Sequence, residues 1–390
     1  MKKTLSVFWA VVVPLGVTLL LASCTTIEKT APTTKFFNDH LFAPPTVRIH
    51  RDDVFAVSDE MRHYLAANIG DQLRKKGPHQ GLFDALYSQN QLKLEYDSVR
   101  TRNAQEAFAA RSGNCLSLAI MTGALAKEMG IGVRFQRVFV EQDWSRNNGI
   151  YFSSGHVNLT LGKTLSEGAF RYGQSHLLTI DFYPLSENAR QHAYAINETA
   201  IIAMYMNNRA AESLVAGEID NAYWWAREAI WQDPDLLIAY NTLGVIYRHH
   251  KNLREAEAVF NYLLAREPDN LQVMSNLAIA LNNQGRTEES QALTSRAAKI
   301  QPYPPFHFFN LGQAAMRDGN FKAAKDLFAK EVSRAAYHSE FHFWLASAYV
   351  GLGEIREAQK HLVLANEYSA TPKERALYSA KLERIKSYRN

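Results

Sequence analysis

Cysteine is scarce in this sequence, since its 390 residues contain only Cys24 and Cys115. An excess of charge is also lacking, because 43 Lys and Arg nearly balance 39 Asp and Glu, and the two signs are interspersed. This balance does not point to a nucleic-acid partner. After residue 23, no apolar run is long enough to span a bilayer. The length that remains allows two folded domains.

Residues 1–23 predict a cleaved export signal. Two lysines precede an apolar stretch from Val7 to Ala22, and small residues lead to Cys24. The pattern resembles a bacterial lipoprotein signal, which implies that Cys24 becomes a lipid-modified N-terminus. An uncleaved anchor with an incidental cysteine is the alternative. Thr25, in place of an aspartate, favours the outer membrane, with the protein facing the periplasm. Removal of the signal lowers the formal net charge from +4 to +2, because two lysines and no acids are lost.

The segment after the signal predicts a tether. Residues 24–46 are rich in Thr and Pro and show little apolar periodicity. With Cys24 lipid-modified, Cys115 has no disulfide partner in its own chain. Thiols in exported proteins tend to oxidise, so a free Cys115 needs an explanation, and catalysis is one hypothesis.

The C-terminal half repeats with a period of 34 residues. Leucines, each followed by a small residue, hold one register, and glycines, alanines and prolines hold others: Leu243, Leu277, Leu311 and Leu345; Gly217, Gly285, Gly319 and Gly353; Ala222, Ala256, Ala324 and Ala358; Pro234, Pro268 and Pro302. The pattern resembles the tetratricopeptide repeat. The resemblance implies an all-α solenoid with repeats at 203–236, 237–270, 271–304, 305–338 and 339–372, and a capping helix at 373–390.

The repeat resemblance implies a concave surface that binds a peptide or protein partner. Most of the many aromatic residues are expected to fill the space between helices, while the alternative places some of them in a peptide groove. The histidines of this half are scattered over different repeats, so we expect no metal site, and nothing in the sequence indicates a cofactor.

Residues 47–200 lack the 34-residue period and predict a mixture of helices and strands. We expect one helix over 57–75 and a second over 103–110, which opens with the capping box of Asn103 and Glu106. A buried helix is expected over 115–129, ended by Gly130.

Cys115 is thus expected at the N-terminus of a buried helix. The partial positive charge there favours a thiolate, and unpaired N–H groups of the first turn can stabilise an oxyanion. The alternative is that Cys115 only fills space, because free cysteine is commonly buried.

Three strands are expected after this helix, at 132–140, 155–161 and 176–183. If the last two pair antiparallel about Gly168, their residue numbers sum to 337 and His156 lies opposite Asp181. The pair would supply the base and the orienting carboxylate that a thiol nucleophile needs.

Four neighbouring residues are weaker candidates. His176 is expected at the far end of the hairpin, as a surface or packing residue, and Asp143 is expected in a loop. Trp144 and Tyr151 are candidates for lining a cleft.

Residues 94–140 resemble the core of the transglutaminase-like superfamily, whose members are papain-like cysteine enzymes. The matching elements are Tyr96, the 104–109 helix, Arg111-Ser112-Gly113-Asn114-Cys115, the apolar helix that follows, and Gly130-Ile131-Gly132-Val133-Arg134. The resemblance covers about residues 50–185 and implies an α+β papain/transglutaminase-like fold. It places the family's catalytic residues on Cys115, His156 and Asp181.

The sequence departs from that family at two places. Asn158 stands where an aromatic residue often follows the histidine, and two residues separate Asp181 from Pro184. Both departures bear on substrate specificity.

Our leading hypothesis is a lipid-anchored cysteine peptidase, amidase or acyltransferase that works through a thioester, with hydrolysis favoured over transfer. The repeats would recruit a protein or peptide partner. The alternative is a non-catalytic envelope scaffold that binds partners through the repeats. A third interpretation is a factor that acts on stem peptides of the cell wall.

Overall fold

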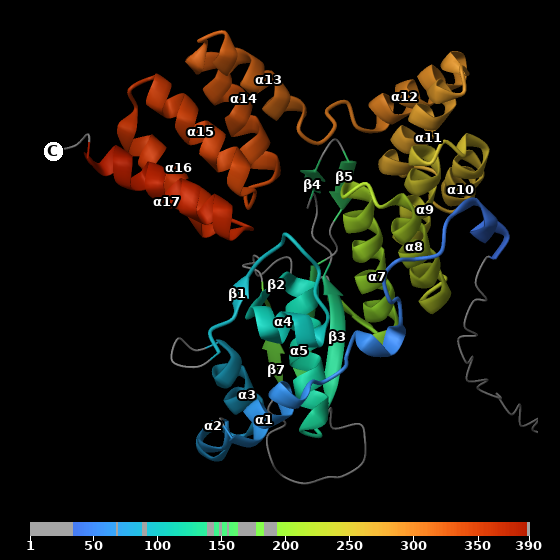
Figure 1. Cartoon of the computed structure of the whole chain (residues 1–390). Helices are drawn as coiled ribbons and strands as arrows, with labels where there is room; N and C mark the ends of the chain where they lie inside the picture. The colour runs from blue at the N-terminus through green and yellow to red at the C-terminus, as the bar shows by residue number, and fades with distance from the viewer. Residues whose placement is uncertain are drawn as a thin grey trace, which may run out of the picture. The chain divides into compact units, whose positions relative to one another are not determined.

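The computed structural model describes residues 34–67, 69–87, 92–138, 144–147, 150–153, 156–162, 177–182 and 193–387. Cys24, Asp143 and His176 lie outside these residues, as does the expected signal. The described chain is mostly helical, with a small sheet in its N-terminal part and paired helices in its C-terminal half (Figure 1). None of the described helices is long and apolar enough to cross a membrane.

Five helices precede the sheet: α1 Asp59–Ala67, α2 Gly70–Lys76, α3 Pro78–Tyr87, α4 Ala104–Ala110 and α5 Cys115–Glu128. The expected single helix over 57–75 is wrong, because α1 ends at Ala67 and a second helix, α2, begins at Gly70. Ile69, which directly precedes α2, is completely buried, so its side chain lies in the core between the two helices. The expected helix over 103–110 is confirmed, and Asn103 and Glu106 form the capping box.

Helix α5 is the central helix of the N-terminal part. It starts at Cys115 as predicted, and every residue from Leu116 to Ala126 is buried. Gly123 allows close packing on the sheet, since a Cβ at this position would lie 2.8 Å from the Phe135 ring. Gly130, with φ of +71°, follows the end of the helix.

The main sheet is antiparallel, with the order β7-β6-β3-β8. Its strands are β3 Val133–Val138, β6 His156–Leu161, β7 Leu178–Ile180 and β8 Ala193–Ile196. Two short pairs complete the strands: β1 Glu95–Tyr96 runs parallel to β2 Ser112–Gly113, and β4 Trp144–Asn147 forms a hairpin with β5 Ile150–Ser153.

The register of β6 and β7 differs from the expected one. Leu161 pairs with Leu178 and Leu159 with Ile180, so the residue numbers sum to 339 and not to 337. The expected direct pairing of His156 with Asp181 is therefore wrong by two residues. A shift of two keeps each side chain on its face of the sheet. His156, Asn158 and Thr160 share one face as predicted, although both faces of β6 are buried.

The C-terminal half consists of five helix pairs and a last helix: α7 Glu198–Val215 with α8 Ile219–Gln232, α9 Leu237–His249 with α10 Leu253–Arg266, α11 Leu271–Asn283 with α12 Thr287–Ile300, α13 His307–Arg317 with α14 Phe321–Arg334, α15 Ser339–Gly351 with α16 Ile355–Glu367, and α17 Pro372–Ser387. The 34-residue pattern is explained by packing. A Cβ at Gly244 or Gly312 would lie 2.5 or 2.6 Å from the ring of Phe260 or Phe328 in the partner helix.

The repeats do not form one continuous core. Leu243, Leu277 and Leu345 are buried, but the equivalent Leu311 is 47% exposed. Helix α12 contributes no buried residue, and the cores on either side of it are separate. Three prolines in residues 301–306 join the two groups of helices.

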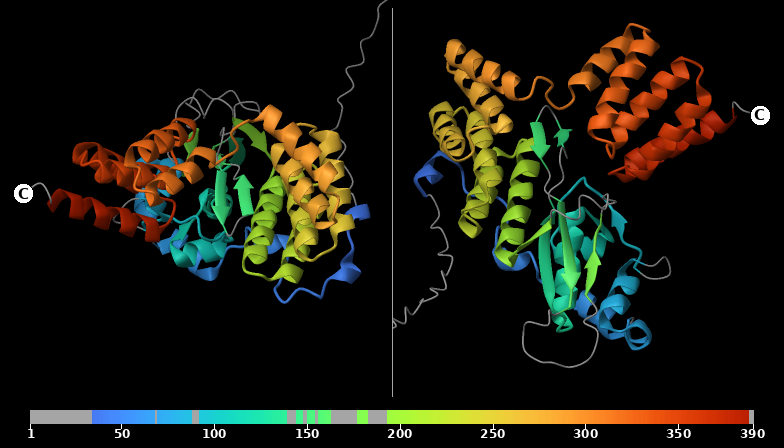
Figure 2. Two further views of the ribbon diagram at one scale, coloured as in Figure 1. Left: turned by 90° about the horizontal axis from the view of Figure 1, so that it is seen from above. Right: turned by 180° about the vertical axis from the view of Figure 1, so that it is seen from behind.

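Residues 34–46 of the expected tether are not a free connection, and residues 24–33 lie outside the described residues. Residues 34–46 lie against α8, α9 and α10, and include the short 3-10 turns η1 Thr34–Phe36 and η2 Asp39–Leu41. The blue segment beside these helices is visible from two sides (Figure 1, Figure 2). Phe36 and Phe42 belong to the core that the repeats share with the N-terminal part.

Candidate functional site

The structure brings together His156 and Asp181. His156 opens β6, where its backbone pairs with Val138 of β3, and Asp181 directly follows β7. The Nε2 atom of His156 lies 2.7 Å from Oδ1 of Asp181, and both side chains are at least nine-tenths buried. The two side chains reach each other diagonally across neighbouring strands, which explains how they meet despite the shifted register.

Cys115 completes this group. Helix α5 packs on β6, and the thiol at its first residue lies close enough to His156 to affect the charge of the imidazole. Since Nε2 of the imidazole faces Asp181, Nδ1 is the ring nitrogen left for the thiol. Cys115 is a free cysteine, and the residue is only partly buried. The three residues therefore lie in the order thiol, imidazole, carboxylate.

The imidazole of this group holds its proton strongly. Burial acts to lower the pKa of His156, but the hydrogen bonds to Asp181 and Cys115, with the charges of both partners, outweigh it and raise the pKa to about 10. His156 is thus an imidazolium at neutral pH.

The backbone before Cys115 is built to start a helix at this residue. Arg111 adopts a left-handed conformation with φ of 51° after α4, and Ser112–Gly113 then pairs with β1. A Cβ on Gly113 would lie 2.6 Å from Cβ of Ser117, so glycine permits the tight approach. Asn114 caps α5 by accepting a 2.9 Å hydrogen bond from the N–H of Ser117.

The cap leaves two first-turn N–H groups beside the thiol. In the described part of the chain, the N–H groups of Cys115 and Leu116 precede the first intrahelical bond, which Leu118 donates to Asn114. Donors in this position are suited to an oxyanion that forms next to the sulfur.

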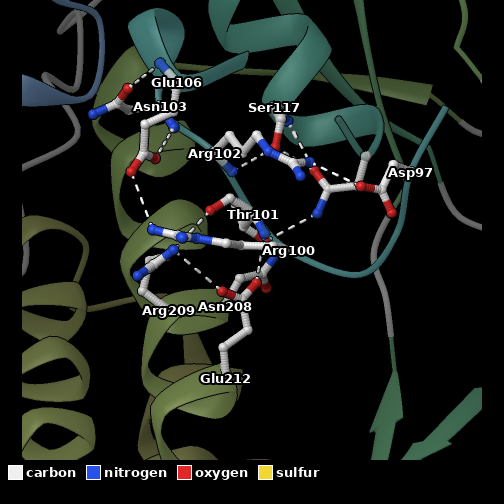
Figure 3. A network of polar contacts seen from close by, with 11 residues as sticks. Asp97, Arg100, Thr101, Arg102, Asn103, Glu106, Ser117, Asn208, Arg209 and Glu212 are labelled. Carbon is white, nitrogen blue, oxygen red and sulfur yellow. Dashed lines mark hydrogen bonds and ion pairs between the residues drawn. The ribbon is translucent and has the colours of Figure 1, made fainter. Parts of the chain in front are cut away.

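A polar network connects this cap to the first repeat helix (Figure 3). The Nδ2 group of Asn114 donates to Oγ1 of Thr101 at 2.9 Å. Thr101 is in turn held from α7, because its N–H donates to Glu212 at 2.6 Å and its carbonyl accepts from Arg209 at 3.1 Å. Asn208 donates to the same hydroxyl at 3.3 Å. The position of the Cys115 helix start is thus tied to the repeats.

Sequence reasoning missed part of this arrangement. Asn158 lies next to Asp181, with Nδ2 3.5 Å from Oδ2, and its own Oδ1 is buried without a hydrogen-bond partner. Asn114 before an apolar helix is a recognisable cap signal, but nothing in the sequence links it to Thr101. The side chains of Trp144 and Tyr151 lie outside the described ones, so their expected place in a cleft stays a prediction.

Among the residues that the structure describes, no group of His, Cys, Asp and Glu is arranged to hold a metal ion. The histidines His342 and His361 of the repeats do meet, with their Nδ1 atoms 2.9 Å apart, but they lack a third ligand of these types.

The comparisons with known proteins concern the repeats. Two family models, both described as tetratricopeptide repeat, match residues 247–307 and 309–362. The C-terminal half therefore carries tetratricopeptide repeats, as predicted. No curated protein matches the chain. The transglutaminase-like resemblance of the N-terminal part stays a prediction.

Solved structures with similarity to the chain each correspond to a little under half of it. TTC0263, a thermophilic repeat protein of Thermus thermophilus, is 19% identical over 46% of this chain and 98% of its own, with a TM-score of 0.28. The pilF protein of Pseudomonas aeruginosa is 20% identical over 48% of this chain and 85% of its own, with a TM-score of 0.28. YrrB, a repeat protein with an unusual peptide-binding site, is 19% identical over 46% of this chain and 92% of its own, with a TM-score of 0.25.

Proposed function

We propose that this chain is a scaffold that binds a protein or peptide partner through its repeats. The observation that carries the proposal is the array of helix pairs from α7 to α16, together with the two tetratricopeptide matches inside it. Stacked helix pairs offer an extended surface for a partner, and such repeats generally bind proteins or peptides. This function was the alternative in our sequence analysis, and it has more support than the enzyme hypothesis.

Site-specific photo-crosslinking in the producing cells tests the binding function. A photoreactive phenylalanine analogue replaces Leu311, which is 47% exposed on α13, or Val99, which is 67% exposed outside the repeats. The scaffold function predicts discrete crosslinked products from position 311 and none of the same size from position 99. Identical products from both positions, or none from position 311, would contradict it.

A second function, cysteine acyl transfer, is favoured by the arrangement of Cys115, His156 and Asp181. In this proposal the Cys115 thiolate attacks the carbonyl carbon of a peptide or amide, and the N–H groups of the first turn of α5 stabilise the oxyanion. The His156 imidazolium gives its proton to the leaving amine as the C–N bond breaks. Water then attacks the carbonyl carbon of the resulting thioester and gives a proton to the imidazole, and the C–S bond breaks to release the carboxylic acid and the Cys115 thiolate. Asp181 holds the ring in position throughout.

The chemical part of this proposal can be tested without a known substrate. p-Nitrophenyl acetate should acetylate Cys115, and mass spectrometry should locate the acetyl group in the intact protein. Cys115→Ala should abolish this adduct, and His156→Gln should slow both its formation and its hydrolysis. His249→Gln, which changes a repeat histidine, serves as the matched control. Equal acetylation of wild-type and His156→Gln protein would exclude the acyl-transfer function.

We also propose that the chain is a lipoprotein attached to the outer membrane of a bacterial envelope through Cys24. The support is the signal-like N-terminal sequence alone.

A further inference from the structure

Residues 34–46 are bound by the repeats in the way that a receptor binds a peptide. Side chains of α8 and α9 contact five main-chain groups of this segment. The contacts are Tyr223 Oη with the N–H of Asn38 (2.9 Å), Asp220 with the N–H of Ala43 (2.9 Å), Asn221 with the N–H of Thr46 (2.9 Å), Trp224 Nε1 with the carbonyl of Ala43 (2.7 Å) and Tyr247 Oη with the carbonyl of Phe36 (2.6 Å). Recognition of the main chain by side chains does not depend on the sequence of the ligand.

Two aromatic residues, six positions apart, fix the segment at both ends. Phe36 packs against Tyr240 and Tyr262, the latter with ring centroids 4.9 Å apart. Phe42 stacks on Tyr223 at 3.9 Å with an angle of 6° between the rings. Each phenylalanine is 7% exposed. These contacts supply the sequence preference that the main-chain contacts lack.

The residues between the two aromatic anchors add charge and hydrogen bonds. Asp39 accepts from the Tyr223 hydroxyl at 2.6 Å and from Nε of Arg227 at 3.0 Å. Nδ2 of Asn38 donates to the Tyr247 hydroxyl at 3.0 Å. Tyr223 and Tyr247 are completely buried, and each hydroxyl bonds to the segment. Removal of the segment would therefore open an aromatic surface with unpaired hydroxyl groups.

The connection to the rest of the chain is exposed, from Ala43 to Arg48. We infer that helices α8–α10 form a binding site for a peptide that carries two aromatic residues six positions apart around an Asn-Asp pair, and that residues 34–46 of this chain are its resident ligand. This inference rests on the proposed binding function and names one site and one ligand for it. Covalent linkage gives the resident segment a high effective concentration, so an added peptide competes poorly until the link is cut.

A cleavable form of the full chain tests the inference. A protease recognition sequence is inserted after Val47, where the chain is exposed, and the purified protein is cut after folding. A fluorescent peptide with the sequence of residues 34–46 is then titrated in, and its anisotropy is measured. We expect saturable binding to cut protein, at least about tenfold tighter than to uncut protein. The same peptide with Phe36→Ala and Phe42→Ala should bind at least about 100-fold more weakly, since it loses two buried rings.

Three results would overturn the inference: no binding of the peptide to cut protein, equal binding of the double-alanine peptide, or loss of the helical circular dichroism signal on cutting. The last result would show that the segment is an inseparable part of the fold. None of them affects crosslinking from position 311, which lies outside α8–α10, so failure of this inference and failure of the binding function can be told apart.

Discussion

Nε2 of His156 lies 2.7 Å from Oδ1 of Asp181, which leaves Nδ1 as the ring nitrogen available to the thiol of Cys115. The carboxylate thereby fixes the orientation of the imidazole as well as its charge. A ring held in this way can interact with the sulfur through one nitrogen only, which is the geometry a cysteine nucleophile requires.

Replacement of Asp181 by Asn is expected to lower the pKa of His156 clearly below its raised value of about 10, because it removes the negative charge that stabilises the imidazolium. NMR titration of the imidazole measures this shift. Thr179→Val is the matched control, since Thr179 bonds to Thr160 on the same two strands. A His156 titration that is the same in Asp181→Asn and wild-type protein would contradict the assignment.

Removal of the cap by Asn114→Ala is expected to cost about 1 kcal/mol of unfolding free energy, and in addition to slow alkylation of Cys115. The stability loss follows from the bond to Ser117, and the effect on the thiol from the displaced helix start. Urea unfolding and iodoacetamide kinetics give the two quantities. Asn270→Ala removes the equivalent cap of α11 and should cost similar stability without changing the thiol. Equal alkylation rates in Asn114→Ala and Asn270→Ala would show that the cap of α5 does not affect the reactivity of Cys115.

From the His342–His361 pair we expect the stability of the last repeats to fall in acid. Nε2 of His342 donates to the carbonyl of Ala336, so its Nδ1 accepts from His361 and the pair is neutral. Burial lowers the pKa of both histidines, that of His361 to about 4, with help from the neighbouring His342. Because the unfolded histidine titrates near 6.5, the contribution of His361 to stability is complete above that pH and is lost as the pH falls towards 4.

Urea unfolding at pH 7 and pH 4.5 tests this pair. We expect His361→Gln to remove roughly 1–2 kcal/mol of the acid-induced loss, a figure reduced for solvent screening at a half-exposed site. Glutamine keeps a donor for His342 but does not titrate. His307→Gln, on α13, controls for a general loss of charge. The account of the pair fails if the two variants show the same pH dependence.

Lipid modification is expected at Cys24 and at no other residue. Cells fed radioactive palmitate should label the wild-type chain and not Cys24→Ala, while Cys115→Ala should keep its label. Label on the Cys24→Ala protein would refute the proposed anchor.

The sequence predicted the elements whose signals are local. The 34-residue spacing of small residues such as Gly244 and Gly312 arises from contacts within one helix pair, and these pairs form as expected. Asn103 marked a helix start because a cap bonds to a residue only three positions further on. The alternation in β6 placed His156 on the correct face.

Features that depend on distant contacts could not be predicted. The β6–β7 register could not be read from the sequence, and an estimate symmetric about Gly168 missed it by two residues. The burial of Phe36 and Phe42 depends on Tyr223, Tyr240 and Tyr262, which are far away in the sequence. Thr101 has no motif of its own, and only the approach of α7 gives it a role.

The alkylation rate of Cys115 as a function of pH tests most directly whether the N-terminal part holds a chemically active site on a binding scaffold. If His156 acts on the thiol, His156→Gln should react at least about tenfold more slowly than the wild type at pH 6. His249→Gln should match the wild type throughout. Identical pH curves for wild-type and His156→Gln protein would contradict the pairing of Cys115 with His156 and leave the repeats as the functional part of the chain.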